Sequence, residues 1–493
     1  MESAIELTED KQEIQYIADD TKFSKQIKSN HQTHKPDSFY LYWAVFTVQL
    51  LTVVSGTSVV WTSPVIPKLT SNDTQVNPLG TPATTTDISM IAASPIITSL
   101  IGALVLPRLS DTIGRRMYLL TMGVGLLISH ILLAFSASVL LIVISRCIVG
   151  TFLAGSFSVI PIYVTEICED HNRAKFGCYL GLFHQIGHFY CFIIGPYFSM
   201  RILTLLLMIP IIPFLISFFF LPESPAYLLS KGKENKCRQA LKKLRNTKDS
   251  SKIESEFHKL VESDKTKNFA TKSPGYLSFF TNKETKVGFM LALLPCQVQI
   301  LSGITVIMSF LAPLFNSAKT SISGDHVAIA VGILKISCFF LTSAVVEKLG
   351  RKRMLIYSSV GSGLSLFGLG CFFYLKHINS QLLDKLGWLP LTLILSYVGL
   401  YSLGIGPIPM AIMHEMFPAE YRAVAGSLLT TIGNIIMFTI VFSFPLITAS
   451  IGSHWAVWAF SSFCIFGALL IHIFLPETKG KSLSEIQDIL QSY

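Results

Sequence analysis

The feature that most constrains this chain is a series of long apolar stretches, each of a length that can cross a bilayer. A spanning helix needs roughly 20 apolar residues, and only helices and closed barrels satisfy their own backbone inside hydrocarbon. The stretches lie near 39–62, 88–106, 117–136, 139–163, 178–198, 202–221, 287–311, 326–346, 354–375, 388–411, 424–448 and 454–475. We therefore predict an all-α polytopic membrane protein with twelve transmembrane helices.

The composition agrees with this prediction and excludes other classes of protein. Hydrophobic residues make up 51% of the 493 residues and charged residues 14%, whereas a typical globular domain is about 25% charged. This excludes nucleic-acid-binding proteins, soluble enzymes and secreted disulfide scaffolds. Paired catalytic carboxylates and the sequences His-Glu-x-x-His and Gly-x-Ser-x-Gly are missing, so we predict no enzymatic activity and no cofactor. His130, His184 and His188 fall in spans without carboxylates, and we predict no metal site.

The spans divide six and six around a polar gap. We predict a cytoplasmic N-terminal tail at 1–38, an N-terminal six-helix half at 39–221, a cytoplasmic helical linker at 222–285, a C-terminal six-helix half at 286–475 and a cytoplasmic C-terminal tail at 476–493. The linker mixes Leu with Lys and Arg, which is typical of a solvated helix covering the inner mouth. A basic patch that contacts phospholipid is the second interpretation.

The basic residues predict the orientation of the chain in the membrane. Arg115, Arg116 and Arg173 all fall in loops on one side, and the linker holds most of the remaining Lys and Arg. Cytoplasmic loops collect these residues, so we place both termini in the cytoplasm and the protein in the plasma membrane. The only Asn-x-Ser/Thr triplet is Asn72-Asp73-Thr74, in the first outer loop, which makes Asn72 a predicted glycosylation site.

Several charged motifs recur in the two halves. Asp-Thr-Ile-Gly-Arg-Arg at 111–116 corresponds to Glu-Lys-Leu-Gly-Arg-Lys at 347–352, and an acid precedes an arginine by seven positions at 166–173 and again at 415–422. Pro-Glu-Ser-Pro at 222–225 matches Pro-Glu-Thr-Lys at 476–479. Repeated halves are typical of transporters, which bind their substrate between the halves near the middle of the membrane.

These motifs also carry a family resemblance, which extends over essentially all of the chain after residue 38. The matching motifs occur in the family's order. They are the stretch at 107–116, Arg146-x-x-x-Gly-x-x-x-x-Gly, Pro161-Ile-Tyr-Val-Thr-Glu-Ile, His184-Gln185, Gln299-Ile-Leu-Ser-Gly-Ile-Thr and Gly404-Ile-Gly-Pro-Ile-Pro. The sequence resembles the sugar porter family of the major facilitator superfamily, most closely its insect trehalose transporter branch. The resemblance implies two pseudo-symmetric six-helix halves and sugar transport by alternating access. It implies no obligate protein partner, only the sugar and the lipid bilayer.

Charged residues at the inner ends of the spans are predicted to form a gating network. Its members are Asp111, Arg115, Arg116, Arg146, Glu166, Arg173, Glu347, Arg351, Lys352, Glu415 and Arg422. An ion pair between the halves that forms in one conformation and breaks in the other biases a two-state equilibrium. The alternative is that the basic residues only set topology, but this does not explain acids at matching positions in both halves. Gly404, Gly406, Pro407 and Pro409 predict a broken gating helix in span 10.

The predicted substrate pocket contains two intramembrane amides, Gln185 and Gln299, which suit pairs of sugar hydroxyls. The alternative is that they hydrogen-bond one helix to another. The resemblance also places Thr305, Ser402 and Met410 in the pocket. The sequence departs from the family there, because Thr305 stands for an Asn and Met410 for a Trp that stacks on the sugar.

Lys335, in the eighth span, stands where the resemblance places an amide. A lysine this deep costs about 2.5–3.5 kcal/mol. The first acid that follows on its helix is Glu347, about 18 Å away, so we predict that Lys335 lies in a water-filled cavity. One interpretation is that Lys335 binds an anionic or strongly polar substrate. The other is that Lys335 donates hydrogen bonds to sugar hydroxyls or to carbonyls of the pocket.

The first span predicts how transport is driven. It has no carboxylate between residues 38 and 72, and Ser58 stands where proton-coupled relatives carry Asp. We predict facilitated uniport of a hexose or a disaccharide such as trehalose. One alternative is a transporter of the same fold for another polar or anionic solute. The other is a non-transporting nutrient sensor, for which we expect a long signalling tail where this chain has about 18 residues.

Overall fold

The computed structural model describes residues 38–492 apart from 170, 248, 270–278, 280–282, 319–322, 382, 384–385, 478, 480 and 482. The N-terminal half consists of α2 (Phe39–Val60), α3 (Thr62–Leu69), α4 (Thr85–Leu104), α5 (Pro107–Ile113), α6 (Arg115–Ala134), α7 (Val139–Ile167), α8 (Arg173–Ile194), the 3-10 turn η1 (Gly195–Tyr197), α9 (Met200–Leu207) and α10 (Ile211–Phe220). The linker contains α11 (Pro225–Ser230), α12 (Glu234–Arg245) and α13 (Ser250–Phe269).

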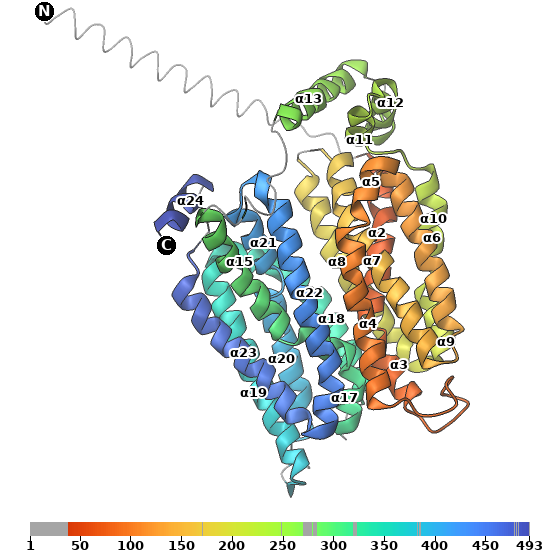
Figure 1. The fold of residues 1–493 in the computed structure, drawn as a ribbon, viewed down its shortest axis with the longest axis vertical. Helices are drawn as coiled ribbons and strands as arrows, with labels where there is room; N and C mark the ends of the chain where they lie inside the picture. The colour runs from red at the N-terminus through yellow and green to blue at the C-terminus, as the bar shows by residue number, and fades with distance from the viewer. Residues whose placement is uncertain are drawn as a thin grey trace, which may run out of the picture.

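The C-terminal half repeats the arrangement of spans. It consists of α15 (Lys283–Leu301), α16 (Ile304–Ser309), α17 (Leu311–Ala318), α18 (Gly324–Leu349), α19 (Arg351–His377), α20 (Leu389–Leu403), α21 (Ile408–Met416), α22 (Ala419–Ser450), α23 (Ser453–Phe474) and the terminal α24 (Leu483–Ser492). The two halves stand side by side (Figure 1). The linker helices and α24 lie at one end of the molecule, which we call the linker end. The loop at 70–84 lies at the opposite end, which we call the loop end.

Eleven helical segments among the described residues are long and apolar enough to cross a membrane. They correspond to eleven of the twelve predicted spans, and the remaining span is α8, which does not meet the same criterion. The cause is local, because His184, Gln185 and His188 lower the hydropathy of its middle. Polar residues inside a span are costly and mark functional positions, so the exception points to α8 as part of a polar site.

Glycines fix how closely α8 approaches α2. A Cβ added to Gly56 would lie 2.1 Å from the carbonyl oxygen of His184, and one added to Gly187 would lie 2.2 Å from that of Val53. Only glycine permits this backbone contact between helices. The contact seats one side of α8 inside the N-terminal half and leaves another side to pack against α18 of the other half.

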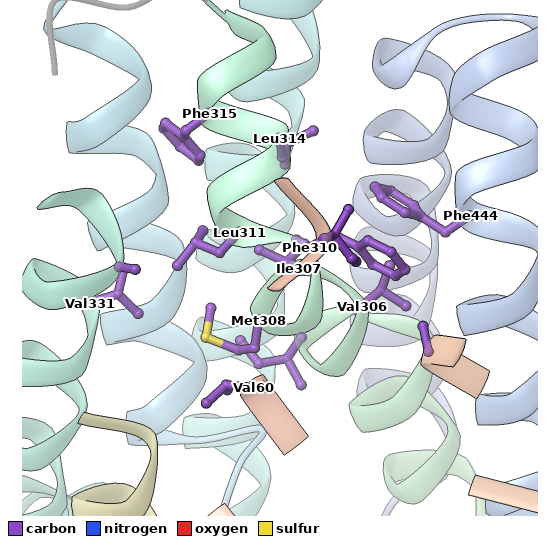
Figure 2. Close-up of a cluster of buried hydrophobic side chains, with 14 of the residues drawn as sticks. Val60, Val306, Ile307, Met308, Phe310, Leu311, Leu314, Phe315, Val331 and Phe444 are labelled. Carbon is purple, nitrogen blue, oxygen red and sulfur yellow. The ribbon is translucent and has the colours of Figure 1, made fainter. Parts of the chain in front are cut away.

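One hydrophobic cluster is shared by the two halves. It joins Val60, Trp61 and Ile66 of the N-terminal half to Met308, Phe310 and other residues of the C-terminal half, and Figure 2 shows Val60 beside Met308 within it. The clusters nearer the linker end draw on a single half each, one on residues 41–244 and the other on residues 279–490. Among the described residues the halves therefore share an apolar core towards the loop end and keep separate cores towards the linker end.

Hydrogen bonds reinforce the shared cluster, which we call the loop-end seal. The Thr62 hydroxyl donates to the carbonyl of Ser309 at 2.9 Å, and the Ser309 hydroxyl donates to the carbonyl of Val59 at 3.1 Å. The backbone N–H of Ala312 donates to the Ser63 hydroxyl at 3.0 Å. All three bonds join the N-terminal to the C-terminal half.

Candidate functional site

Charged side chains form a matched pair of clusters at the linker end. In the N-terminal half the Arg115 guanidinium makes two hydrogen bonds to Glu166, at 3.1 and 3.2 Å, and an ion pair with Asp111 at 2.9 Å. In the C-terminal half Arg351 forms the corresponding ion pair with Glu415. The sequence repeat thus corresponds to a repeated contact, an arginine that begins α6 or α19 bound to an acid near the end of α7 or α21.

Two further carboxylates, Glu223 and Glu477, cap the helices that begin with these arginines. Glu223 accepts hydrogen bonds from the backbone N–H of Arg116 at 3.0 and 3.2 Å. Glu477 accepts from the N–H groups of Arg351 and Lys352 at 3.1 and 3.2 Å. Burial raises the pKa of the Glu223 carboxyl, and hydrogen bonds from the N–H groups of Ser224 and Arg116 oppose this shift. Negative charge at a helix N-terminus is stabilising.

Glycine makes this capping sterically feasible. Gly114 and Gly350 precede the two helices with φ of +98° and +85°, a region that other residues rarely adopt. A Cβ on Gly114 would lie 2.3 Å from the Glu223 carboxylate, and one on Gly350 would lie 3.0 Å from that of Glu477. Sequence reasoning did not assign the two glutamates to the site, although the repeated Pro-Glu was the signal that could have found them.

In this conformation the ion pairs described above lie within one half, and pairing between the halves stays a prediction for the other conformation. The cause is packing, because α6 lies against α7 and brings Arg115 to the acid of its own half. The Arg116 guanidinium donates to the carbonyl of Phe219 and that of Arg422 to the carbonyl of Phe417. Arg173 begins α8, and the Glu347 side chain lies outside the described residues.

Arg146 does not belong to the charged clusters, contrary to prediction. It precedes Glu166 by twenty residues on α7, which corresponds to about 30 Å along the helix. Its side chain is buried, donates to the carbonyls of Ser58 at 2.9 Å and Ile91 at 3.4 Å, and lies over the ring of Trp61 at 5.1 Å. Arg146 therefore ties α7 to α2 and α4 inside the N-terminal half.

Span 10 is interrupted where the proline motif predicted. α20 ends at Leu403 and α21 begins at Ile408, with Gly404–Pro407 between them. The Gln299 amide donates to the carbonyl of Gly406 at 2.6 Å, so in this conformation Gln299 links α15 to the break. Span 7 is also interrupted, at Ser302–Gly303, which the sequence analysis did not predict. Gly303 has φ +78°, and a Cβ there would lie 2.4 Å from the Phe460 ring.

A polar cluster lies where α8 packs on α18, at the seam between the halves. Lys335 Nζ lies 3.1 Å from His188 Nδ1, and the rings of His184 and His188 are 4.7 Å apart. Gln185 Oε1 and His188 Nε2 are buried and have no hydrogen-bond partner among the described residues. The Lys335 side chain is only 7% exposed, which corrects the predicted water-filled surroundings. The partner of Lys335 is His188 of the N-terminal half, which the sequence of span 8 alone cannot predict.

The other predicted pocket residues do not converge on this seam cluster of His184, Gln185, His188 and Lys335. Thr305 is half-buried in α16. The Ser402 hydroxyl donates within its own helix to the carbonyl of Val398 at 2.7 Å, and Met410 is 55% exposed. Sequence reasoning missed Gln297, whose two polar amide atoms are buried and have no partner in the part of the chain that the structure describes. The signal that could have found it was a second amide two positions before Gln299.

The loop end carries a separate pocket of about 300 Å³ between the halves. It is lined mainly by apolar residues, among them Ile66, Ile88, Phe310, Leu314 and Phe444, and contains none of the predicted site residues. Asn72 is exposed in the loop at the same end.

Comparison with known proteins assigns the chain to a family. A family model described as "Sugar (and other) transporter" matches residues 13–490, nearly the whole chain. The chain belongs to the sugar transporter family. Its fold is accordingly the major facilitator fold of two six-helix halves.

Several similar curated proteins come from insects. The chain is 30% identical over 465 residues to the facilitated trehalose transporter Tret1 of Anopheles gambiae, covering 93% of this chain and 58% of that protein. It is 29% identical over 444 residues to Tret1 of Culex quinquefasciatus, covering 90% and 84%. The chain therefore spans little more than half the length of the Anopheles relative.

Solved structures show the same fold. The inward-open xylose transporter XylE from E. coli matches with a TM-score of 0.74 and 20% identity, covering 91% of this chain and 99% of that one. A partially occluded inward-open form of XylE matches with a TM-score of 0.71 and 22% identity, covering 90% and 100%. In this chain the charged clusters occupy matching places in the two halves, whereas Lys335 at the seam comes from the C-terminal half alone.

Proposed function

We propose that the protein carries a hexose or a disaccharide such as trehalose across the plasma membrane by facilitated uniport. The observation that carries the proposal is a set of buried polar atoms with no partner among the described residues, from the amides of Gln185 and Gln297 and the imidazole of His188, on helices of both halves. An unpartnered buried amide is costly. A sugar supplies the missing hydrogen bonds, because each of its hydroxyls both donates and accepts.

The distribution of apolar clusters supports alternating access. The loop-end seal joins the halves at one end, and separate clusters occupy the other. With the loop end outside and both termini in the cytoplasm, this conformation is closed to the outside. Transport requires the seal to separate while the linker ends approach, and the interruptions at Ser302–Gly303 and Gly404–Pro407 are where α15–α16 and α20–α21 can bend.

In this proposal the residues have distinct roles. Substrate contacts come from Gln185, Gln299, Thr305, Lys335, Ser402 and Met410, and gating from the two charged clusters at the linker end. Because each cluster joins helices within a half, its role is to hold that half together as a rigid body while the halves rock. Asn72, exposed at the loop end, carries a glycan.

The surroundings of Arg146 support the proposal of uniport. The guanidinium meets the backbone carbonyl of Ser58 at 2.9 Å, and a carbonyl cannot change its protonation state during a transport cycle. The sequence has no Asp or Glu from residue 38 to residue 72. Proton symport requires a group that binds and releases a proton, and the first span offers none of the carboxylates that serve this purpose.

Uptake in oocytes tests the proposal. Radiolabelled glucose and trehalose are supplied to oocytes expressing the full chain, with water-injected oocytes as the control. We expect saturable uptake that equilibrates without accumulation and is unchanged by a protonophore. Accumulation above the outside concentration that a protonophore abolishes would refute uniport, and uptake equal to that of the water-injected oocytes would refute sugar transport.

A further inference from the structure

The α8–α18 seam holds a positive charge that no described carboxylate neutralises. The described ion pairs involve Arg115, Arg238, Arg245, Arg351 and two histidines, but not Lys335. Lys335 is 7% exposed and meets His188 of the opposite half. A buried cation without a counter-charge is unstable unless something else supplies that charge.

The seam places Lys335 between two aromatic contacts. A Cβ on Gly332 would lie 2.9 Å from the Phe189 ring, and one on Gly181 would lie 3.0 Å from the Phe339 ring. Because α8 and α18 run in opposite directions across the seam, the first contact is nearer the loop end and the second nearer the linker end. The lysine is thus enclosed between apolar contacts at both ends of the seam cluster.

The hydrogen-bonding groups that have no partner at the seam indicate which chemical groups a ligand needs there. A protonated Lys335 has three donors and directs one at His188 Nδ1, so a neutral His188 carries its proton on Nε2. Within the described part of the chain, that Nε2–H is buried without an acceptor, and Gln185 Oε1 is buried without a donor. The unmet groups are therefore donors around a positive charge and one amide acceptor beside them.

We propose that the seam cluster of His184, Gln185, His188 and Lys335 binds a carboxylate that is attached to a polyhydroxylated body, so that the transported solute is a sugar acid. The carboxylate oxygens accept from Lys335 Nζ and His188 Nε2–H, and a neighbouring hydroxyl donates to Gln185 Oε1. This inference rests on the proposed transport function and replaces its neutral sugar with a sugar acid as the preferred substrate.

Binding of a carboxylate at the seam cluster affects the transport cycle. In the described conformation Lys335 and His188 bridge the two halves. Lys335 keeps two donors beyond the one directed at His188 Nδ1, so a carboxylate that accepts from Lys335 Nζ and His188 Nε2–H adds a second link between the halves. Such a ligand binds more tightly to the conformation in which the two donors lie close together, and it shifts the equilibrium towards that conformation.

D-Glucuronate and D-glucose form a matched pair of probes, because they differ only in having a carboxylate or a hydroxymethyl group at one carbon. Uptake of both is measured in oocytes expressing the full chain, together with competition by each against the other. The variants are Lys335→Gln, Lys335→Arg and, as a control at an exposed lysine away from the seam, Lys286→Gln. Surface biotinylation normalises every rate, and propionate serves as a carboxylate without hydroxyls.

We expect glucuronate to compete at concentrations at least tenfold below those of glucose and propionate. A lost contact between a buried cation and a carboxylate corresponds to well over tenfold in affinity. Lys335→Gln is therefore expected to raise the half-inhibitory concentration of glucuronate more than tenfold while changing that of glucose less than threefold. Lys335→Arg retains the charge and keeps the preference for the anion, and Lys286→Gln behaves as the wild type.

The outcomes separate this inference from the proposed function. If glucose is taken up, and glucuronate is neither transported nor competes with it, the inference is overturned while facilitated sugar transport stands. Glucuronate uptake that depends on Lys335, with no uptake of neutral sugar, supports the inference and refutes the neutral substrate. Equal competition by propionate and glucuronate refutes the polyhydroxylated body. If Lys335→Gln fails to reach the surface, the Lys335→Arg variant and the wild-type competition series still decide the question.

Discussion

The loop-end seal offers a direct test of alternating access through the double variant Thr62→Val/Ser63→Ala. Thr62 donates to the carbonyl of Ser309 at 2.9 Å, and Ser63 accepts from the N–H of Ala312 at 3.0 Å. Both hydroxyls are buried, at 1% and 0% exposure, so each removal leaves a buried backbone group unpaired at a cost of about 1–3 kcal/mol.

The magnitude of the effect follows from where these bonds exist. Both join the two halves, so they stabilise only the conformation in which the loop end is closed. Losing both costs that conformation about 2–6 kcal/mol, whereas water satisfies the same groups once the seal opens. The population open at the loop end should therefore increase by a factor of roughly 30 or more.

Labelling of Ile66→Cys with a membrane-impermeant maleimide on intact cells measures this population. Ile66 is 4% exposed and belongs to the seal, and labelling is corrected for the same background without the added cysteine. We expect slow labelling in the parent and much faster labelling in the double variant. Ser461→Ala is the matched control, because its buried hydroxyl donates to the carbonyl of Gly363 at 2.7 Å within the C-terminal half. Unchanged labelling in the double variant, or an equal increase in the control, would refute the reasoning.

Three further changes test particular residues. Gly303→Ala should reduce uptake and thermal stability together, because the added Cβ meets the Phe460 ring at 2.4 Å and φ is +78°; a wild-type melting curve for the purified variant would contradict this. Gln299→Ala should lower uptake several-fold at equal surface expression, because the Gly406 carbonyl loses a donor at 2.6 Å; unchanged kinetics would show that the bond contributes nothing to the cycle. Asn72→Gln should remove a glycan and increase mobility on a denaturing gel while leaving uptake intact; a glycosidase-sensitive shift that persists in the variant would place the glycan elsewhere.

Local properties of the sequence determined the fold and the charged motifs. A stretch of apolar residues specifies a spanning helix by itself, because the free energy of transferring each residue into the bilayer depends little on its neighbours in space. The interruption of span 10 was equally local, since Pro407 and Pro409 lack the N–H groups that a continuous helix requires. The repeated motifs likewise predicted that Arg115 and Arg351 act at matching positions, and the structure pairs them with Glu166 and Glu415.

Partnership between distant residues was decided by the tertiary structure alone. Lys335 and His188 are 147 positions apart, and nothing in either span specifies the other. The same holds for Arg146, whose charge suggested a gating role until α2 and α4 supplied the carbonyls of Ser58 and Ile91. A charged side chain in a span indicates that a partner is needed, but the sequence does not say which one. The partner is the group that the packing of the helices brings within about 3 Å. That packing depends on contacts such as Gly56 against His184, which only the folded chain brings together.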